Sequence, residues 1–176
     1  MKNRVIVDCT FERHAQQILE IYNDTIHNST SLYEYESRTM KTMEVWFKTK
    51  NENNFPVIGI ENKNGVLTGF GSYGAFRPYP AKKYSVEHSV YVHKDHRGHG
   101  IGRLVLTALI EAARENGLHV MVGAIDTANV GSIVLHKRLG FKHVGTLEQI
   151  GFKFGRWLDM GLYQLTLDTP SHPRDG

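Results

Sequence analysis

The chain contains little that would cross-link it, insert it into a membrane or attract it to a polyanion. Cys9 is the only cysteine, so no internal disulfide can form, which is typical of a reducing compartment. No stretch approaches the ~18 apolar residues of a membrane span, and the N-terminus lacks a signal-peptide pattern. The net charge is only +3, without the basic stripe of a nucleic-acid-binding protein. We therefore expect a cytoplasmic protein without membrane or nucleic-acid partners.

Hydrophobic spacing predicts alternating strands and helices in a chain of 176 residues that is 40% apolar. Strands are expected at residues 4–9, 55–61, 66–76, 84–92, 120–125, 142–150 and 157–167, and helices at 12–26, 39–50, 101–116 and 129–139. Consecutive strands without intervening helices near residues 55–92 indicate a mixed sheet that begins antiparallel. We expect one α/β domain over residues 4–168 and a flexible polar tail over 169–176.

Turn chemistry supports several of these boundaries. Asn64-Gly65 accepts the positive φ of a hairpin turn. Asn129 is placed to cap the last helix, and Gly140 to stop it. Glycines within the predicted strand 66–76 indicate a bulge or a close neighbour.

The segment "HRGHGIGR" (96–103) joins a predicted strand to a predicted helix. A P-loop would need Lys-Ser/Thr after its last glycine, and a dinucleotide fingerprint would need glycine where Arg103 stands. An Arg-x-x-Gly-x-Gly cradle for a pyrophosphate fits instead, formed by Arg97, Gly100 and Gly102. Small residues let backbone amides approach an anion, and the helix N-terminus adds positive charge. A glycine-rich turn without a ligand is the alternative.

Three histidines recur at every third position beside this loop, at His93, His96 and His99. A metal site would usually combine them with cysteine or acidic ligands, and the glycines between them suit an anion better. We expect solvated loop histidines and no metal.

Two segments together carry a family resemblance. "VYVHKDHRGHGIGRL" resembles the acyl-CoA motif of the Gcn5-related N-acetyltransferase (GNAT) superfamily, and "IDTANVGSIVLHKRLGF" resembles its second signature. "YGAFRP", "VEHSVYV" and "KFGRWLDM" resemble the phosphinothricin and methionine sulfoximine acetyltransferase branch. The similarity runs from about Arg4 to Leu167. It implies a single-domain fold with a mixed, mostly antiparallel sheet flanked by helices, a homodimer, and acetyl transfer from acetyl-CoA to a primary amine without a metal.

The resemblance also assigns the residues that would bind acetyl-CoA. Backbone groups of Val90, Tyr91 and Val92 would meet the pantetheine arm as an added strand does. Asn129 would bond the pantetheine, and Ser132 would reach the cofactor near the helix start. The pyrophosphate would be taken by the loop, whose members are Arg97, Gly98, His99, Gly100, Ile101, Gly102 and Arg103.

The chemistry implied needs a neutral amine, although a free amino group is mostly protonated at neutral pH. Glu87 is the candidate base, through a water, or the anchor of the substrate ammonium; a satisfied structural carboxylate is the alternative. His136 stands where many family members have a tyrosine that protonates the leaving thiolate. It is a candidate acid or cofactor contact, with a partly buried helix histidine as the alternative.

The acceptor is implied by "FRPY". Arg77 would pair with a substrate carboxylate, and Pro78 and Tyr79 would shape the pocket wall, opposite Glu87, His88 and Ser89. A solvated loop charge is the alternative for Arg77. Together these residues describe an amino-acid substrate of the methionine sulfoximine, methionine sulfone or phosphinothricin type. The alternatives are a protein N-terminus, a polyamine, or a non-catalytic acetyl-CoA sensor; the basic loop favours an acidic or zwitterionic acceptor over a polyamine.

Overall fold

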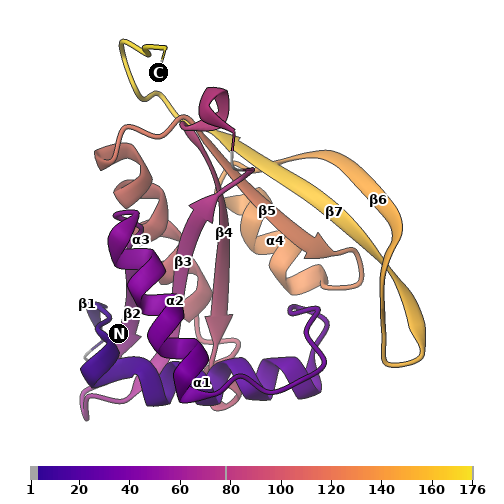
Figure 1. Ribbon diagram of the computed structural model, residues 1–176. Coiled ribbons are helices and arrows are strands. Elements are labelled where there is room, and N and C mark those ends of the chain that lie inside the picture. Colours follow the sequence, from indigo (N-terminus) through magenta and orange to yellow (C-terminus); the bar gives the residue numbers. More distant parts are fainter. Residues whose placement is uncertain (1–3, 78, 176) are drawn as a thin grey trace. The chain divides into compact units, whose positions relative to one another are not determined.

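The computed structural model describes residues 4–77 and 79–175 (Figure 1). The strands and helices are, in chain order, β1 (Val5–Asp8), α1 (Phe11–Asn28), α2 (Met40–Glu52), β2 (Val57–Glu61), β3 (Leu67–Ala75), β4 (Ser85–Val92), α3 (Ile101–Glu115), β5 (Val120–Asp126), α4 (Val130–Arg138), β6 (Lys142–Lys153) and β7 (Arg156–Thr166). Two single 3₁₀ turns, η1 (Pro80–Lys82) and η2 (Lys94–His96), precede β4 and α3. Each predicted strand and helix is present.

The strands follow the hydrogen-bonded order β1-β2-β3-β4-β5-β7-β6. Strands β4 and β5 are parallel, whereas β1–β2, β2–β3, β5–β7 and β6–β7 are antiparallel. The predicted α/β class with a mixed, mostly antiparallel sheet and flanking helices is therefore confirmed.

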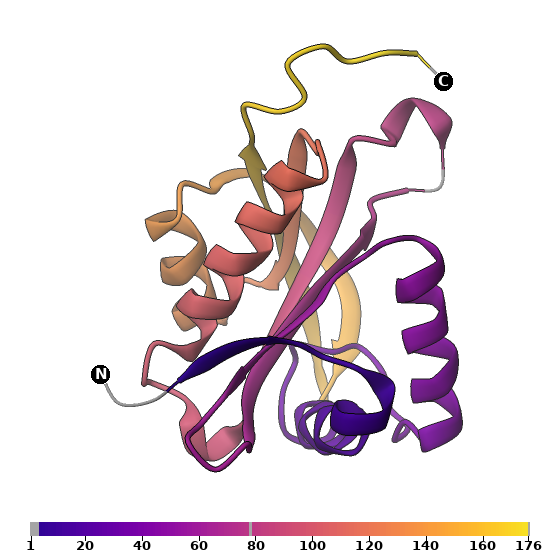
Figure 2. The same cartoon turned by 90° about the vertical axis from the view of Figure 1, so that its left-hand side faces the viewer.

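The backbone contacts divide the chain into two units. The first comprises the chain up to Tyr73 together with Ser89–Leu109, and the second comprises Gly74–His88 together with the chain from Ile110 onward. Within the first unit, Figure 2 shows α1 almost end-on and α2 upright, so these two helices cross. The face of α1 that the periodicity predicted is buried with residues of α2, β3 and β4, among them Ile18, Tyr22, Met43, Phe47, Phe70 and Tyr91.

Glycines in β3 allow close contact with β4 within the first unit. A Cβ at Gly69 would lie 2.9 Å from the Tyr91 carbonyl oxygen, and one at Gly71 would lie 2.7 Å from the Ser89 carbonyl oxygen. Both distances are shorter than real Cβ contacts, so a side chain at either position would displace the backbone of β4. The predicted close neighbour is therefore confirmed, and it is the strand that carries the candidate site.

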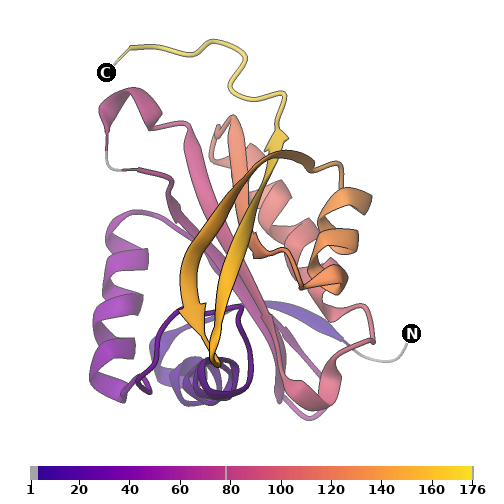
Figure 3. The same ribbon diagram turned by 90° about the vertical axis from the view of Figure 1, so that its right-hand side faces the viewer.

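The second unit contains β5, α4 and a long ribbon formed by β6 and β7 (Figure 3). Strand β6 continues to Lys153, beyond its predicted end at Ile150. Its register against β7 shifts between Leu147 and Gly151, and Gln149 has a φ of 52°. This irregularity interrupts the alternation of buried and exposed side chains by which a strand is recognised in a sequence. The predicted strand therefore ended before the observed one.

Residues beyond β7 contact the second unit at several points. The Thr169 carbonyl oxygen lies 2.8 Å from His119 Nδ1, and the Arg174 amide donates to the Tyr84 hydroxyl at 3.1 Å. The flexibility of residues 169–176 remains a prediction. In the described part of the chain, no helix has the length and apolar character needed to cross a membrane.

Candidate active site

The glycine loop places two left-handed residues directly before α3. Gly98 and Gly100 have φ values of 76° and 78°, and no atom lies within 4 Å of a Cβ built on either. Helix α3 then begins at Ile101, and the Leu104 amide donates to the Gly100 carbonyl oxygen at 3.2 Å. The first amides of a helix have no partner within it and carry partial positive charge. The space around these two glycines is consistent with the predicted pyrophosphate cradle, which stays a prediction.

Arg97 is held at the edge of this loop by two contacts. Its Nη2 lies 3.3 Å from Asp24 Oδ2 of α1, and its Nε lies 3.3 Å from the Val92 carbonyl oxygen. Half of the Arg97 side chain stays exposed, at 50%. Asp24 was not predicted as part of the site, because it lies 73 residues away and carries no local signal. The Arg4 guanidinium adds a bond to the His99 carbonyl oxygen at 2.8 Å.

The end of β4 presents its backbone over an aromatic cluster. The Tyr91 ring is buried, 5.0 Å from the Tyr22 ring and 5.5 Å from the Phe70 ring between centroids. Val90 and Val92 on either side are half-buried. The rings fix the position of this strand end, which the sequence assigns to the pantetheine arm.

The start of β4 separates Glu87 from His88. Glu87 is exposed, whereas His88 on the opposite face is buried. Although Glu87 is exposed, neighbouring protein atoms desolvate its carboxyl and raise its pKa, and the charge of Arg77 acts in the opposite direction. A raised pKa suits a carboxyl that accepts a proton from an amine, and the role of Glu87 as base or ammonium anchor stays a prediction.

The predicted acceptor loop is exposed and locally strained. Arg77 has a φ of 150° and its guanidinium lies 5.7 Å from the Phe76 ring centroid. Strained backbone of this kind often occurs at functional sites. Tyr79 is 65% exposed, with Lys82 Nζ 5.4 Å from its ring centroid. Pro78, the third predicted wall residue, lies outside the described residues.

Helix α4 brings together the other predicted residues. Asn129 caps it, accepting from the Ser132 amide at 3.1 Å. One turn later, buried His136 directs Nδ1 at the Ser132 carbonyl oxygen, 2.7 Å away, and Nε2 at His88 Nε2, 2.9 Å away. The pairing of His88 with His136 was not predicted, although strand alternation already placed His88 on the face opposite Glu87. Its assignment to the substrate, like that of Ser89, stays a prediction.

The remaining loop residues are arranged around local contacts. Ile101 is buried, while Arg103 is exposed in the first turn of α3 and Gly102 is half-buried. His93 Nδ1 accepts from the Asp95 amide and caps η2. Within residues 4–77 and 79–175, no group of three or more histidine, cysteine or acidic side chains is placed to hold a metal ion.

Comparisons with known proteins identify the family of this chain. A family model described as an acetyltransferase (GNAT) domain matches residues 10–162. An L-methionine sulfoximine/L-methionine sulfone acetyltransferase from Pseudomonas aeruginosa is 46% identical over 151 residues, covering 86% of this chain and 88% of that protein. A solved structure from Acinetobacter baylyi ADP1 has a TM-score of 0.98 at 56% identity, covering 100% of this chain and 98% of that chain.

A second solved structure adds the cofactor. It is a phosphinothricin acetyltransferase from Sinorhizobium meliloti in complex with acetyl-CoA, with a TM-score of 0.92 at 30% identity over 99% of this chain and 94% of that one. The protein is therefore an acetyl-CoA-dependent N-acetyltransferase in class. With a family model that spans most of its length, the chain belongs to the GNAT acetyltransferases. The predicted enzyme class, cofactor and family resemblance are confirmed.

Proposed function

We propose that this enzyme acetylates the α-amino group of a small amino-acid-like substrate of the methionine sulfoximine, methionine sulfone or phosphinothricin type. The observation that carries the proposal is that two opposite charges on one short segment influence each other. They are the Glu87 carboxyl, whose pKa is raised, and the Arg77 guanidinium, whose charge acts against that rise. A carboxylate suits an ammonium group, and a guanidinium suits a carboxylate. The names of the relatives point to the same substrates.

In the proposed reaction, the substrate loses an ammonium proton to Glu87, directly or through a water. The neutral nitrogen then forms a bond to the acetyl carbonyl carbon, and the carbon–sulfur bond breaks with its electron pair leaving on the sulfur. The nitrogen gives up its second proton as the amide forms, and the thiolate takes up a proton to become the free thiol of CoA. The thiolate is already a fair leaving group, since a simple thiol has a pKa near ~8.5. The acetyl group therefore passes directly from the CoA sulfur to the substrate nitrogen, without a covalent enzyme intermediate.

A cysteine-linked acetyl intermediate has no support in the first unit. Cys9 is buried, and burial together with the Glu61 charge raises its pKa to about 12. Because the thiolate is the nucleophilic form, this side chain is unreactive at neutral pH. Direct transfer from acetyl-CoA to the amine is the simpler assignment.

For acetyl-CoA, we propose that the loop Arg97–Arg103 takes the pyrophosphate and that Val90, Tyr91 and Val92 meet the pantetheine arm. The open left-handed glycines and the exposed Arg97 support the first assignment. Asn129 and Ser132 are proposed as further pantetheine contacts, on the resemblance alone. We also propose a cytoplasmic homodimer; exposed apolar side chains on the β6–β7 ribbon support self-association.

The experiment is a thiol-release assay with acetyl-CoA and a panel of acceptors. The panel holds the three named compounds, ordinary amino acids, spermidine and a peptide with a free N-terminus. Wild type is compared with Arg77→Ala and Glu87→Gln, and Lys83→Ala serves as the matched loop control. We expect one of the three compounds to turn over, and Arg77→Ala and Glu87→Gln to each lower kcat/KM at least tenfold, roughly 1.4 kcal/mol.

Other outcomes identify the alternatives. Preference for spermidine or the peptide, or an unchanged kcat/KM in Arg77→Ala, would show that the substrate assignment is wrong. Thermal stabilisation by acetyl-CoA without turnover of any amine would indicate a sensor instead of an enzyme.

A further inference from the structure

Two buried imidazoles contact each other in the second unit. His88 Nε2 of β4 lies 2.9 Å from His136 Nε2 of α4, and the two residues are 6% and 4% exposed. The Phe141 ring lies 5.2 Å from one imidazole and 5.1 Å from the other, between centroids. The pair is therefore enclosed by protein, where an unmatched nitrogen is costly.

Strand β5 makes room for this pair. A Cβ at Gly123 would lie 2.9 Å from His88 Cε1 and 3.1 Å from His136 Nε2. Any side chain at Gly123 would push the rings apart. The two imidazoles thus lie directly against the backbone of Gly123, and the Phe141 ring contacts both of them.

The hydrogen-bond partners decide which nitrogens carry protons. His136 Nδ1 lies 2.7 Å from the Ser132 carbonyl oxygen, which can only accept, so Nδ1 must carry a hydrogen. In a neutral ring, Nε2 of His136 then has a lone pair and must accept. His88 Nε2 is therefore the donor of the shared bond, and His88 Nδ1 is left with a lone pair. Among the described residues, that nitrogen has no hydrogen-bond partner.

We infer that both imidazole rings are neutral at neutral pH, because the pKa of each is lowered. Burial and the nearby His136 lower the pKa of His88 to about 3, and the Val122 backbone offsets only part of this. Burial likewise lowers the pKa of His136, against the bond to Ser132. One donor and one acceptor then face each other, which two charged rings would not allow.

We propose that His88 is a positioning residue: its Nε2–H holds His136 in the Nδ1–H tautomer and fixes the ring beside the first turn of α4. The inference deepens the proposed function, on which it rests for the role of His136 in acetyl transfer. It has a direct consequence for that role. While the pair is intact, His136 Nε2 has no proton to give, so it does not protonate the leaving thiolate.

The only proton of His136 then lies on the side of Ser132. Nδ1 is 2.7 Å from the Ser132 carbonyl oxygen and 3.4 Å from its hydroxyl oxygen. His136 therefore acts by ordering this turn of α4, which the family resemblance assigns to the cofactor, and His88 acts through it. His88 itself touches no reacting group in this assignment.

The test reads the tautomer directly, by two-bond ¹H–¹⁵N correlation spectra of the full chain labelled with ¹⁵N-histidine at neutral pH. His136→Gln identifies the His136 signals. We expect a protonated Nδ1 and an unprotonated Nε2 on His136 in wild type. His88→Gln, whose amide can donate from the position of Nε2, should preserve this pattern, and His88→Phe should lose it. His143→Phe, an exposed histidine in the same unit, is the matched control.

The same variants are assayed with acetyl-CoA and the best acceptor. We expect His88→Phe to raise the KM for acetyl-CoA about tenfold or more with kcat within about twofold, because the turn of α4 that it disorders is assigned to the cofactor, and His88→Gln to recover most of the loss. A proton on His136 Nε2 in wild type, an unchanged tautomer in His88→Phe, or an unchanged KM for acetyl-CoA would each overturn the proposal. If His88→Phe fails to fold, the wild-type and His88→Gln spectra still decide the tautomer. Since the spectra need no substrate, failure of the proposed function alone leaves the tautomer result standing.

Discussion

At the scale of single residues, charges that neighbouring protein atoms partly desolvate link pH to activity and stability. Glu87 and Arg77 are the clearest case for activity. Burial raises the pKa of the Glu87 carboxyl, and the Arg77 charge partly offsets this. Because a base works only when deprotonated, kcat/KM should fall as the pH decreases through this raised pKa.

Removing the Arg77 charge should change the pH at which kcat/KM falls on the acidic side of the pH profile. In Arg77→Ala, nothing offsets the desolvation of Glu87, so its pKa rises further. The acidic limb of kcat/KM should then move to higher pH than in wild type, whereas Lys83→Ala should leave it in place. Profiles measured with one acceptor across the acidic range check this. A limb that stays in place, or moves to lower pH, would show that Arg77 does not act on the base.

Lys50 is the corresponding case for stability. Its Nζ donates to the Tyr73 carbonyl oxygen at 2.7 Å and lies 5.5 Å from the Trp46 ring and 5.6 Å from the Phe55 ring. Desolvation, followed by the Arg38 charge, lowers its pKa from 10.5 to about 8. The folded state therefore releases the proton before the unfolded state does. Stability should rise between about pH 8 and pH 10.5, because there the unfolded chain binds more protons.

The measurement compares wild type with Lys50→Met by urea unfolding near pH 7 and near pH 10. Relative to the variant, wild type should gain up to roughly 3 kcal/mol over this interval. Lys48→Met, which removes a charge that is 73% exposed, should show no such change against wild type. A difference between wild type and Lys50→Met that is independent of pH would mean that Lys50 stays solvated.

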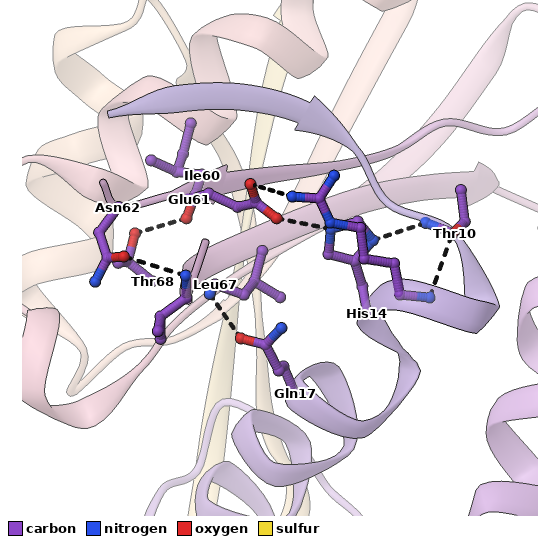
Figure 4. Close-up of polar contacts among 10 residues, drawn as sticks. Thr10, His14, Gln17, Ile60, Glu61, Asn62, Leu67 and Thr68 are labelled. Atoms are coloured by element: carbon purple, nitrogen blue, oxygen red, sulfur yellow. Dashed lines mark hydrogen bonds and ion pairs between the residues drawn. The ribbon is translucent and has the colours of Figure 1, made fainter. Parts of the chain in front are cut away.

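At the scale of elements, a buried polar cluster joins the start of α1 to the end of β2 (Figure 4). The Thr10 amide donates to His14 Nδ1 at 3.0 Å, so His14 Nε2 carries the hydrogen that it directs at Glu61 Oε1, 3.1 Å away. Arg13 Nη2 donates to the other carboxylate oxygen at 2.8 Å. The Glu61 side chain is only 7% exposed, so these contacts replace most of its water.

Glu61→Gln should therefore destabilise the protein although it hardly changes the shape. The neutral amide cannot accept from both His14 and Arg13 as the carboxylate does, and we expect a loss of about 2 kcal/mol in the free energy of unfolding. Urea unfolding at neutral pH measures it. The exposed pair of Lys48 and Glu52 provides the control, since Glu52→Gln should change stability by less than about 0.5 kcal/mol. Equal effects of the two variants would show that the contacts of Glu61 with His14 and Arg13 do not stabilise the fold.

At the scale of the whole molecule, we propose the β6–β7 ribbon as the interface of the proposed homodimer. Its side chains Ile150, Phe154 and Trp157 are 54%, 58% and 60% exposed, more than a stable monomer usually leaves grouped on one ribbon. Trp157→Asp should convert a dimer to a monomer in light scattering coupled to size-exclusion chromatography. Val45→Asp, at an apolar residue of α2 that is 56% exposed, should remain dimeric. A wild-type monomer, or a dimeric Trp157→Asp, would exclude this ribbon as the interface.

The elements could be predicted from local patterns because the physics behind them is local. The apolar spacing of α1, the cap at Asn129 and the positive φ of Gly65 and Gly140 each depend on a few neighbouring residues. The same holds for the glycine loop, whose left-handed Gly98 and Gly100 lie next to a helix start. Together with the motifs that carry the family resemblance, such local patterns determined the fold class and the acetyltransferase family, whereas the role of the glycine loop stays a prediction.

Only the tertiary structure decided how side chains distant in sequence pair. Asp24 reaches Arg97 across 73 residues, and His88 reaches His136 across 48. Sequence alternation could place His88 on one face of β4, but it could not show which residue of α4 meets that face. Such contacts depend on strand order and helix placement, which arise from the summed packing of many residues. The sequence therefore determined which chemical groups are present, and the fold decided their partners, their protons and their charge.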